Sequence, residues 1–173
     1  MKERGDAIVL IGFMGAGKSS VGRTLARMTG LSRFDTDEMV AARFGLTVSQ
    51  IFETKGEEQF REAETGALRE LAGKRGSIIT TGGGILLRPE NAGLLRQLGT
   101  VVHLQADVET LFRRISRRTT RPLLRTENPR ATLMELFRVR LPLYRAAADL
   151  EVDTSLLTHD EVAKRILNQI ENR

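Results

Sequence analysis

The chain has 173 residues, a formal net charge of +5 and no cysteine. This length predicts a single domain over residues 1–173 that buries roughly 70% of the surface exposed by its unfolded form. A chain without cysteine excludes disulfides, thiolate metal sites and thiol nucleophiles. The absence of any run of about 18 apolar residues excludes a membrane-spanning helix.

A glycine-rich stretch near the N-terminus fits the pattern G-x-x-x-x-G-K-[ST] of phosphate-binding loops. The apolar residues 7–11 before it predict a buried strand, and the apolar positions of residues 19–28 have helical spacing. Between a strand and a helix, backbone N–H groups converge on an anion and the helix N-terminus adds positive charge. The expected phosphate-binding residues are Gly12, Met14, Gly15, Ala16, Gly17, Lys18, Ser19 and Ser20. We expect Lys18 to reach the outer phosphates and the Ser19 hydroxyl to join the shell of Mg²⁺.

Two carboxylates follow the next predicted strand, residues 31–34. Open α/β sheets place their sites at the carboxyl ends of strands, where Asp35 and Asp37 lie. If this segment is extended, the two side chains point to different sides, one toward a metal and one toward an acceptor hydroxyl. The alternative is a solvated turn with an aspartate cap.

Helical spacing then resumes through residue 44, in a short helix capped by Thr47, and from residue 57 to 71. Arg61 and Glu64 are three residues apart on the last of these helices, so they can pair. The pair is either a surface ion pair that contributes under ~1 kcal/mol to stability, or an arrangement in which Glu64 orients Arg61 toward a carboxylate-bearing substrate.

The following strand, residues 76–81, runs into three consecutive glycines, Gly82, Gly83 and Gly84. Such a run is required where something approaches closely or where φ is positive. A helix opened by Pro89, a strand over residues 100–104 and a helix capped by Asp107 come next.

Arginine crowds residues 113–130, which Pro122 and Pro129 interrupt. This stretch predicts a mobile lid that closes over ATP, about residues 116–128. A basic patch for nucleic acid is the alternative, but tyrosine and tryptophan are absent from the stretch. A helix over residues 131–147 follows, which Pro142 should bend or break.

The chain ends with a strand over residues 149–153 and a helix that begins at a capping box, Thr158 to Glu161. His103, inside an apolar strand, is expected to be structural, and His159 in the capping box is expected to be exposed. Strands and helices alternate throughout, which predicts an α/β fold with a parallel sheet and helices on both faces.

A phosphate-binding loop alone leaves several nucleotide-dependent functions open. Helicases and transport ATPases need more chain, the Asn-Lys-x-Asp guanine motif of GTPases is absent, and no apolar strand ends in the Asp-Glu of hydrolytic ATPases. A small-molecule kinase remains, with ATP and Mg²⁺ as the cofactors that phosphoryl transfer requires.

The motifs together resemble the shikimate kinase family. The resemblance rests on six segments whose order and spacing cover nearly the whole chain: residues 12–19, 35–37, 56–64, 81–84, 121–124 and 140–144. It implies a three-layer αβα P-loop kinase fold with a five-stranded parallel sheet in the order 2-3-1-4-5. It also implies ATP-dependent phosphorylation of the shikimate 3-hydroxyl in chorismate biosynthesis.

The resemblance further implies a substrate-binding region at about residues 35–64. Asp37 would bind the substrate hydroxyls and serve as base, while Arg61 and Arg140 would clamp the carboxylate. The glycine run would bring N–H groups to the ring substituents. The remaining substrate contacts implied are the ring walls, Phe52 and Phe60.

On the nucleotide side, the resemblance implies that Asp35 holds the magnesium shell and that Arg114 lies against adenine. Arg121 would reach the transferring phosphate from the lid, as a third catalytic residue beside Lys18 and Asp37. His159 falls in the adenine-binding loop, where the family often has proline.

Two rival functions stay open at this point. One is a related kinase of the same fold, such as gluconate kinase, and the other is a nucleotide-binding regulatory protein that uses its arginines for nucleic acid. The expectation is a monomeric cytoplasmic enzyme whose partners are shikimate and ATP, with neither nucleic acid nor a membrane.

Overall fold

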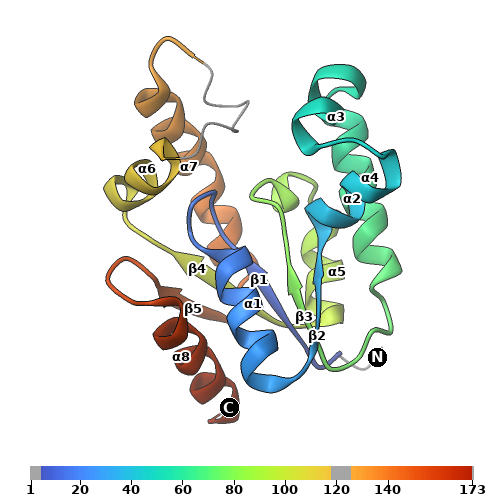
Figure 1. The fold of residues 1–173 in the computed structure, drawn as a ribbon, viewed down its shortest axis with the longest axis vertical. Coiled ribbons are helices and arrows are strands. Elements are labelled where there is room, and N and C mark those ends of the chain that lie inside the picture. The colour runs from blue at the N-terminus through green and yellow to red at the C-terminus, as the bar shows by residue number, and fades with distance from the viewer. Residues whose placement is uncertain (1–4, 118–125, 173) are drawn as a thin grey trace.

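The computed structural model describes residues 5–117 and 126–172 (Figure 1). Five strands form one parallel sheet in the order β2-β3-β1-β4-β5, which confirms the expected fold and strand order. The strands are β1 (Ala7–Ile11), β2 (Ser32–Asp35), β3 (Ser77–Thr80), β4 (Gly99–Gln105) and β5 (Leu150–Asp153).

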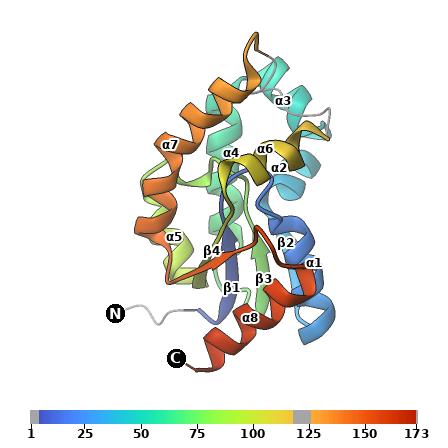
Figure 2. The same ribbon diagram turned by 90° about the vertical axis from the view of Figure 1, so that its left-hand side faces the viewer.

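Helices cover both faces of this sheet, as Figure 2 shows from the side. One face is covered by α1 (Lys18–Thr29) and α8 (His159–Glu171), which pack against each other, and the other by α5 (Glu90–Leu98) and α7 (Pro129–Ala147). The remaining helical elements are α2 (Thr36–Phe44), α3 (Val48–Lys55), α4 (Glu57–Glu70), the 3₁₀ turn η1 (Ile85–Leu87) and α6 (Val108–Ser116). The α2–α4 group and the α6–α7 pair stand on opposite sides of the loop that follows β1 (Figure 1).

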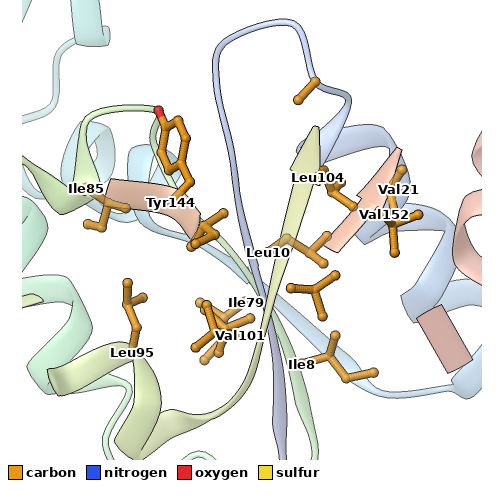
Figure 3. Packing of buried hydrophobic residues seen from close by; sticks show 14 of the residues in the cluster. Ile8, Leu10, Val21, Ile79, Ile85, Leu95, Val101, Leu104, Tyr144 and Val152 are labelled. Carbon is orange, nitrogen blue, oxygen red and sulfur yellow. The ribbon is translucent and has the colours of Figure 1, made fainter. Parts of the chain in front are cut away.

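In the described part of the chain, the buried apolar residues form two clusters. The larger one joins the strands to the helices of both layers and includes Leu10, Val101 and Leu95 (Figure 3). The smaller one lies within the α2–α4 group and consists of Val40, Ile51, Phe60, Ala63 and Ala67. The α2–α4 group therefore has apolar packing of its own beside the sheet.

Local sequence signals set several element ends as predicted. Thr47 and Thr158 begin α3 and α8 with complete capping boxes, and Asp107 caps α6 through the backbone N–H of Thr110. Gly30 ends α1 in the left-handed conformation. These ends depend on neighbours in sequence, which explains why sequence alone locates them.

The expectation of an extended segment from Asp35 to Asp37 is wrong. Helix α2 begins at Thr36, and Asp35 is its N-cap: the carboxylate accepts hydrogen bonds from the backbone N–H groups of Asp37 (3.0 Å) and Glu38 (3.3 Å). The aspartate cap that was the alternative describes this turn, except that Asp35 is buried and not solvated. Capping satisfies helix N–H groups that would otherwise lack a partner, so the helix starts at once.

The two prolines around α7 act differently from the sequence expectation. Pro129 occupies the first turn and opens the helix, a position where its missing N–H costs nothing. Pro142 lies inside the helix without ending it, so of the predicted bend or break, the break does not occur. Arg140 and Tyr144, on either side of it, are buried against the protein, and this packing offsets the lost hydrogen bond.

The predicted lid falls largely on residues 118–125, so Arg121 and Pro122 lie outside the described residues. Within the described ranges, no helix combines the length and the apolar character needed to cross a membrane.

Candidate functional site

The loop between β1 and α1 has the backbone shape of an anion cradle. Gly12, Gly15 and Gly17 have φ values of 145°, 82° and 96°, which side-chain-bearing residues rarely adopt. A Cβ on Gly12 would also overlap the carbonyl of Leu104. The Lys18 ammonium donates hydrogen bonds to the carbonyls of Gly12 (2.8 Å) and Phe13 (3.0 Å), which holds it over the loop.

A cavity of about 400 Å³ opens at this loop. It brings together predicted site residues from five separate parts of the chain, including Asp37 and Arg114. Its predicted members are Met14, Gly15, Ala16, Gly17, Lys18, Ser19, Ser20, Asp35, Asp37, Gly82, Gly83, Arg114 and His159. Thr81, Ile115, Arg117, Thr154 and Leu157 complete its lining.

The Ser19 hydroxyl and the Asp35 carboxylate meet at one edge of the cavity, with Oγ 3.5 Å from Oδ2. Oδ1 of Asp35 caps α2, while Oδ2 also accepts from Thr80 (2.7 Å) and lies 3.4 Å from the guanidinium of Arg33. Within the described ranges no cluster of three acidic or histidine side chains could hold a metal. The oxygen donors that are present, the Ser19 hydroxyl and the Asp35 carboxylate, fit Mg²⁺, which keeps several waters and takes few protein ligands.

At the nucleotide end, Arg114 is fixed by backbone and hydroxyl acceptors. Its guanidinium donates to the Thr154 carbonyl (2.7 Å), the Thr154 hydroxyl (3.1 Å) and the Gly15 carbonyl (3.3 Å). Thr154 in turn donates to the Ala16 carbonyl (3.2 Å). The loop after β5 is thereby tied to the phosphate loop, and His159 is exposed at the cavity edge as predicted.

Beyond the cavity, Arg61 and Glu64 form a buried ion pair. The guanidinium lies 2.6 Å from the Glu64 carboxylate and 3.0 Å from that of Glu57, and the Arg61 and Glu64 side chains are 8% and 1% exposed. The alternative of a surface ion pair is therefore wrong. The rings of Phe52 and Phe60 lie 4.7 Å apart, and the guanidinium stands 5.7 Å and 5.3 Å from them.

The glycine run after β3 lies against these charged groups. A Cβ on Gly82 would lie 2.5 Å from a Glu64 oxygen and 2.6 Å from an Asp37 oxygen. A Cβ on Gly84 would overlap the guanidinium of Arg61. Unlike the phosphate loop, this run has no positive φ, so close approach is the reason for its glycines.

Arg140 approaches the same run from α7. It is only 4% exposed, and one of its terminal nitrogens would lie 3.8 Å from a Cβ on Gly83. Among the described residues, nothing accepts from Nε of Arg140, and nothing donates to Oε1 of Glu64. Buried polar atoms without partners are costly, and a polar ligand beside the glycine run would supply partners for these two.

Burial raises the pKa of the Glu64 carboxyl to about 7, because desolvation outweighs the attraction of Arg61. The negative charge of Asp37 adds to this rise. The pKa of Arg61 is raised by its two carboxylate partners, in spite of the opposing effect of its burial. The cation is therefore permanent, and Glu64 titrates near neutral pH.

Sequence reasoning missed Tyr144 and Thr154. The hydroxyl of the buried Tyr144 donates to the Gly83 carbonyl, and Tyr144 lies one helical turn after Arg140. That spacing of four was the available signal for Tyr144. Thr154 carried no comparable signal, because its partners, Ala16 and Arg114, are distant in sequence.

Comparison with known proteins identifies the relatives of this chain. A family model described as shikimate kinase matches residues 14–171, nearly the whole length. The chain belongs to the shikimate kinase family. A shikimate kinase from Thioalkalivibrio sulfidiphilus is 51% identical over 147 residues, which cover 85% of this chain and 77% of the relative. The family consists of ATP-dependent kinases, in agreement with the function predicted from the sequence.

Solved structures distinguish this family from the rival kinase. A shikimate kinase from Acinetobacter baumannii in complex with shikimate has a TM-score of 0.92 and 39% identity, covering 97% of this chain and 94% of its own. A gluconokinase from Sinorhizobium meliloti 1021 has a TM-score of 0.60 and 18% identity, covering 98% of this chain and 94% of its own. That second likeness is one of fold alone, so gluconate kinase is not favoured.

Proposed function

We propose that this chain transfers the γ-phosphate of ATP to the 3-hydroxyl of shikimate, giving shikimate 3-phosphate and ADP. The observation that carries the proposal is the pair of buried arginines, Arg61 and Arg140, beside one glycine run and next to a phosphate loop. Two buried cations suit an acceptor that bears a carboxylate, since both can donate paired hydrogen bonds to it. The shikimate-bound relative supports the same acceptor.

We assign the carboxylate of shikimate to Arg61 and Arg140. The backbone N–H groups of the glycine run would meet the ring substituents, and the rings of Phe52 and Phe60 would wall the ligand. Asp37, in the first turn of α2 at the cavity edge, would bind the acceptor hydroxyls. It would accept the proton of the 3-hydroxyl as the phosphoryl group is transferred.

For ATP, we assign the phosphates to the loop backbone and the N-terminus of α1. Lys18 would follow the outer phosphates as charge moves, and Arg114 would lie against adenine with His159 nearby. The Ser19 hydroxyl would hold Mg²⁺ directly and Asp35 through water. Bound magnesium neutralises charge on the phosphate oxygens.

Further expectations stay predictions, as do the residue roles assigned above. Arg121 would reach the transferring phosphate, although it lies outside the described residues. The enzyme would act in the cytoplasm, in chorismate biosynthesis, and it would be a monomer. Size-exclusion chromatography with light scattering tests the last of these.

A coupled assay of ADP formation tests the function. With magnesium and ATP present, we expect turnover that depends on shikimate and none that depends on gluconate. Turnover with gluconate and not with shikimate would contradict the proposal. Salt-dependent retention on nucleic acid without acceptor-dependent turnover would favour the regulatory alternative.

A further inference from the structure

The hydroxyl of Tyr144 lies where α7, the glycine run and the sheet meet. Tyr144 is 1% exposed, and its hydroxyl donates to the Gly83 carbonyl. Arg140 lies one turn earlier on α7, and one of its terminal nitrogens would lie 3.8 Å from a Cβ on the same Gly83. The hydroxyl of Tyr144 therefore fixes the backbone of the glycine run at the residue that Arg140 approaches.

The geometry of a peptide bond carries this link further. The carbonyl of Gly83 and the N–H of Gly84 belong to one planar unit, and in a trans peptide they point in opposite directions. Fixing the carbonyl on the Tyr144 side therefore fixes where the N–H of Gly84 points. Gly83 lies near a terminal nitrogen of Arg140 and Gly84 lies against the guanidinium of Arg61, so this peptide is beside both arginines.

The ring of Tyr144 packs against the sheet. His103 in β4 faces it with ring centroids 5.2 Å apart and planes 31° apart. Nδ1 of His103 lies 3.1 Å from the Glu151 carboxylate on β5. His103 also pairs in register with Ile11, the last residue of β1 before the phosphate loop. The ring is therefore anchored to the rigid centre of the sheet.

We propose that Tyr144 is a positioning residue of the acceptor site, which holds the Gly83–Gly84 peptide beside Arg140 in the arrangement that receives the substrate carboxylate and ring. This inference rests on the proposed function of the same site. Tyr144 touches no reacting atom, and it acts through the Gly83 carbonyl that it bonds.

Replacing Tyr144 with phenylalanine removes the hydroxyl and keeps the ring. We expect Tyr144→Phe to raise KM for shikimate about fivefold or more, because the Gly83 carbonyl loses a buried partner and the peptide beside Arg140 is no longer held. KM for ATP should change less than about twofold. Thr29→Val is the matched control: it removes a hydroxyl that donates to the Leu25 carbonyl (2.7 Å) at the far end of α1, so it should leave both KM values unchanged.

The outcomes separate the two proposals. Activity of the unmodified enzyme with shikimate, together with an unchanged shikimate KM in Tyr144→Phe, would overturn the positioning role alone. Equal weakening of both substrates in Tyr144→Phe would also overturn it, since it would indicate a purely structural role. Failure of the unmodified enzyme to use shikimate would instead overturn the proposed function.

A second measurement does not depend on the variant folding. The sequence contains one tyrosine and no tryptophan, so 3-fluorotyrosine incorporated throughout labels Tyr144 alone. We expect shikimate, added without nucleotide, to shift the single ¹⁹F resonance, and ATP alone to shift it less. If the ¹⁹F resonance did not shift when calorimetry showed that shikimate binds, the inference would be overturned.

Discussion

The phosphate loop and the run Gly82–Gly84 are both rich in glycine, but different physical demands select those glycines. In the loop, Gly12, Gly15 and Gly17 have positive φ, so the backbone conformation itself requires them. In the run after β3 the φ values are ordinary, and charged side chains of Glu64, Asp37 and Arg61 occupy the space of a Cβ. One site is built of backbone groups and the other of buried side chains.

This difference indicates how each end of the site recognises its ligand. Converging N–H groups and a helix N-terminus suit any phosphate chain. Buried arginines suit an acceptor that bears a carboxylate, because a ligand without an anionic group leaves buried donors unmatched. Changes at the loop should therefore affect nucleotide use and turnover, and changes at the run should affect the acceptor.

The largest expected effect is at the loop. Lys18→Ala should abolish turnover, a loss of roughly 3 kcal/mol or more of transition-state stabilisation, because the ammonium holds charge as the phosphoryl group moves. Steady-state kcat measures this loss. Lys164→Ala, at an exposed lysine on α8, is the control. Near-normal kcat in a folded Lys18→Ala protein would contradict the assignment of this loop as a phosphate-binding loop.

The second-largest effect is expected when a methyl group is added to the glycine run. Gly82→Ala places a Cβ against the Glu64 and Asp37 carboxylates, an overpacking cost of about 2 kcal/mol that should appear mainly as a higher KM for shikimate. Gly93→Ala in α5 adds the same methyl group to open space and should leave kinetics unchanged. If both variants bound shikimate normally, close approach would not be the reason for Gly82.

Smaller losses are expected when the arginine fork is removed and its charge is kept. Arg61→Lys and Arg140→Lys should each raise KM for shikimate by tenfold or more, on the order of 1.4 kcal/mol, with little change in KM for ATP. Arg138→Lys, on the exposed face of the same α7, is the control. Loss of ATP affinity with normal shikimate affinity would contradict the assignment of these arginines to the shikimate site.

The smallest effect is a pH dependence that only the acceptor end should show. Ionised Glu64 repels the incoming carboxylate, so shikimate affinity should fall severalfold as pH rises through about 7. Because this folded pKa lies above the ordinary 4.5, the folded state retains the proton longer, and stability should also fall between pH 4.5 and about 7.

Glu64→Gln tests that pH dependence by removing the titrating group. Shikimate affinity and thermal unfolding, each measured from pH 5 to 8, should then vary less with pH than in the unmodified enzyme. An unchanged pH profile in this variant would show that another group is responsible.

Features that depend on interactions between sequence neighbours could be predicted, and features that depend on distant packing could not. The phosphate loop, the capping boxes at Thr47 and Thr158 and the alternation of strands and helices depend on neighbours, so patterns suffice for them. The start of α2 at Thr36 was missed because an aspartate pair fits both a strand end and a cap. The helix that contains Pro142 was predicted with a bend or a break at the proline, and the break does not occur because distant packing overrides a local penalty.

The acceptor end was the harder part to predict. The sequence brought Arg61 and Glu64 together by spacing, but only the fold shows that they are buried. The bond of Tyr144 to Gly83 joins residues 61 positions apart, and no local pattern encodes it.

The separation of the two ends is tested most directly by calorimetric titration of shikimate into Lys18→Ala without nucleotide. The account predicts an affinity within about threefold of the unmodified enzyme, because the buried arginines and the glycine run are intact. A loss of tenfold or more in a folded protein would contradict it, since the acceptor would then depend on the phosphate loop.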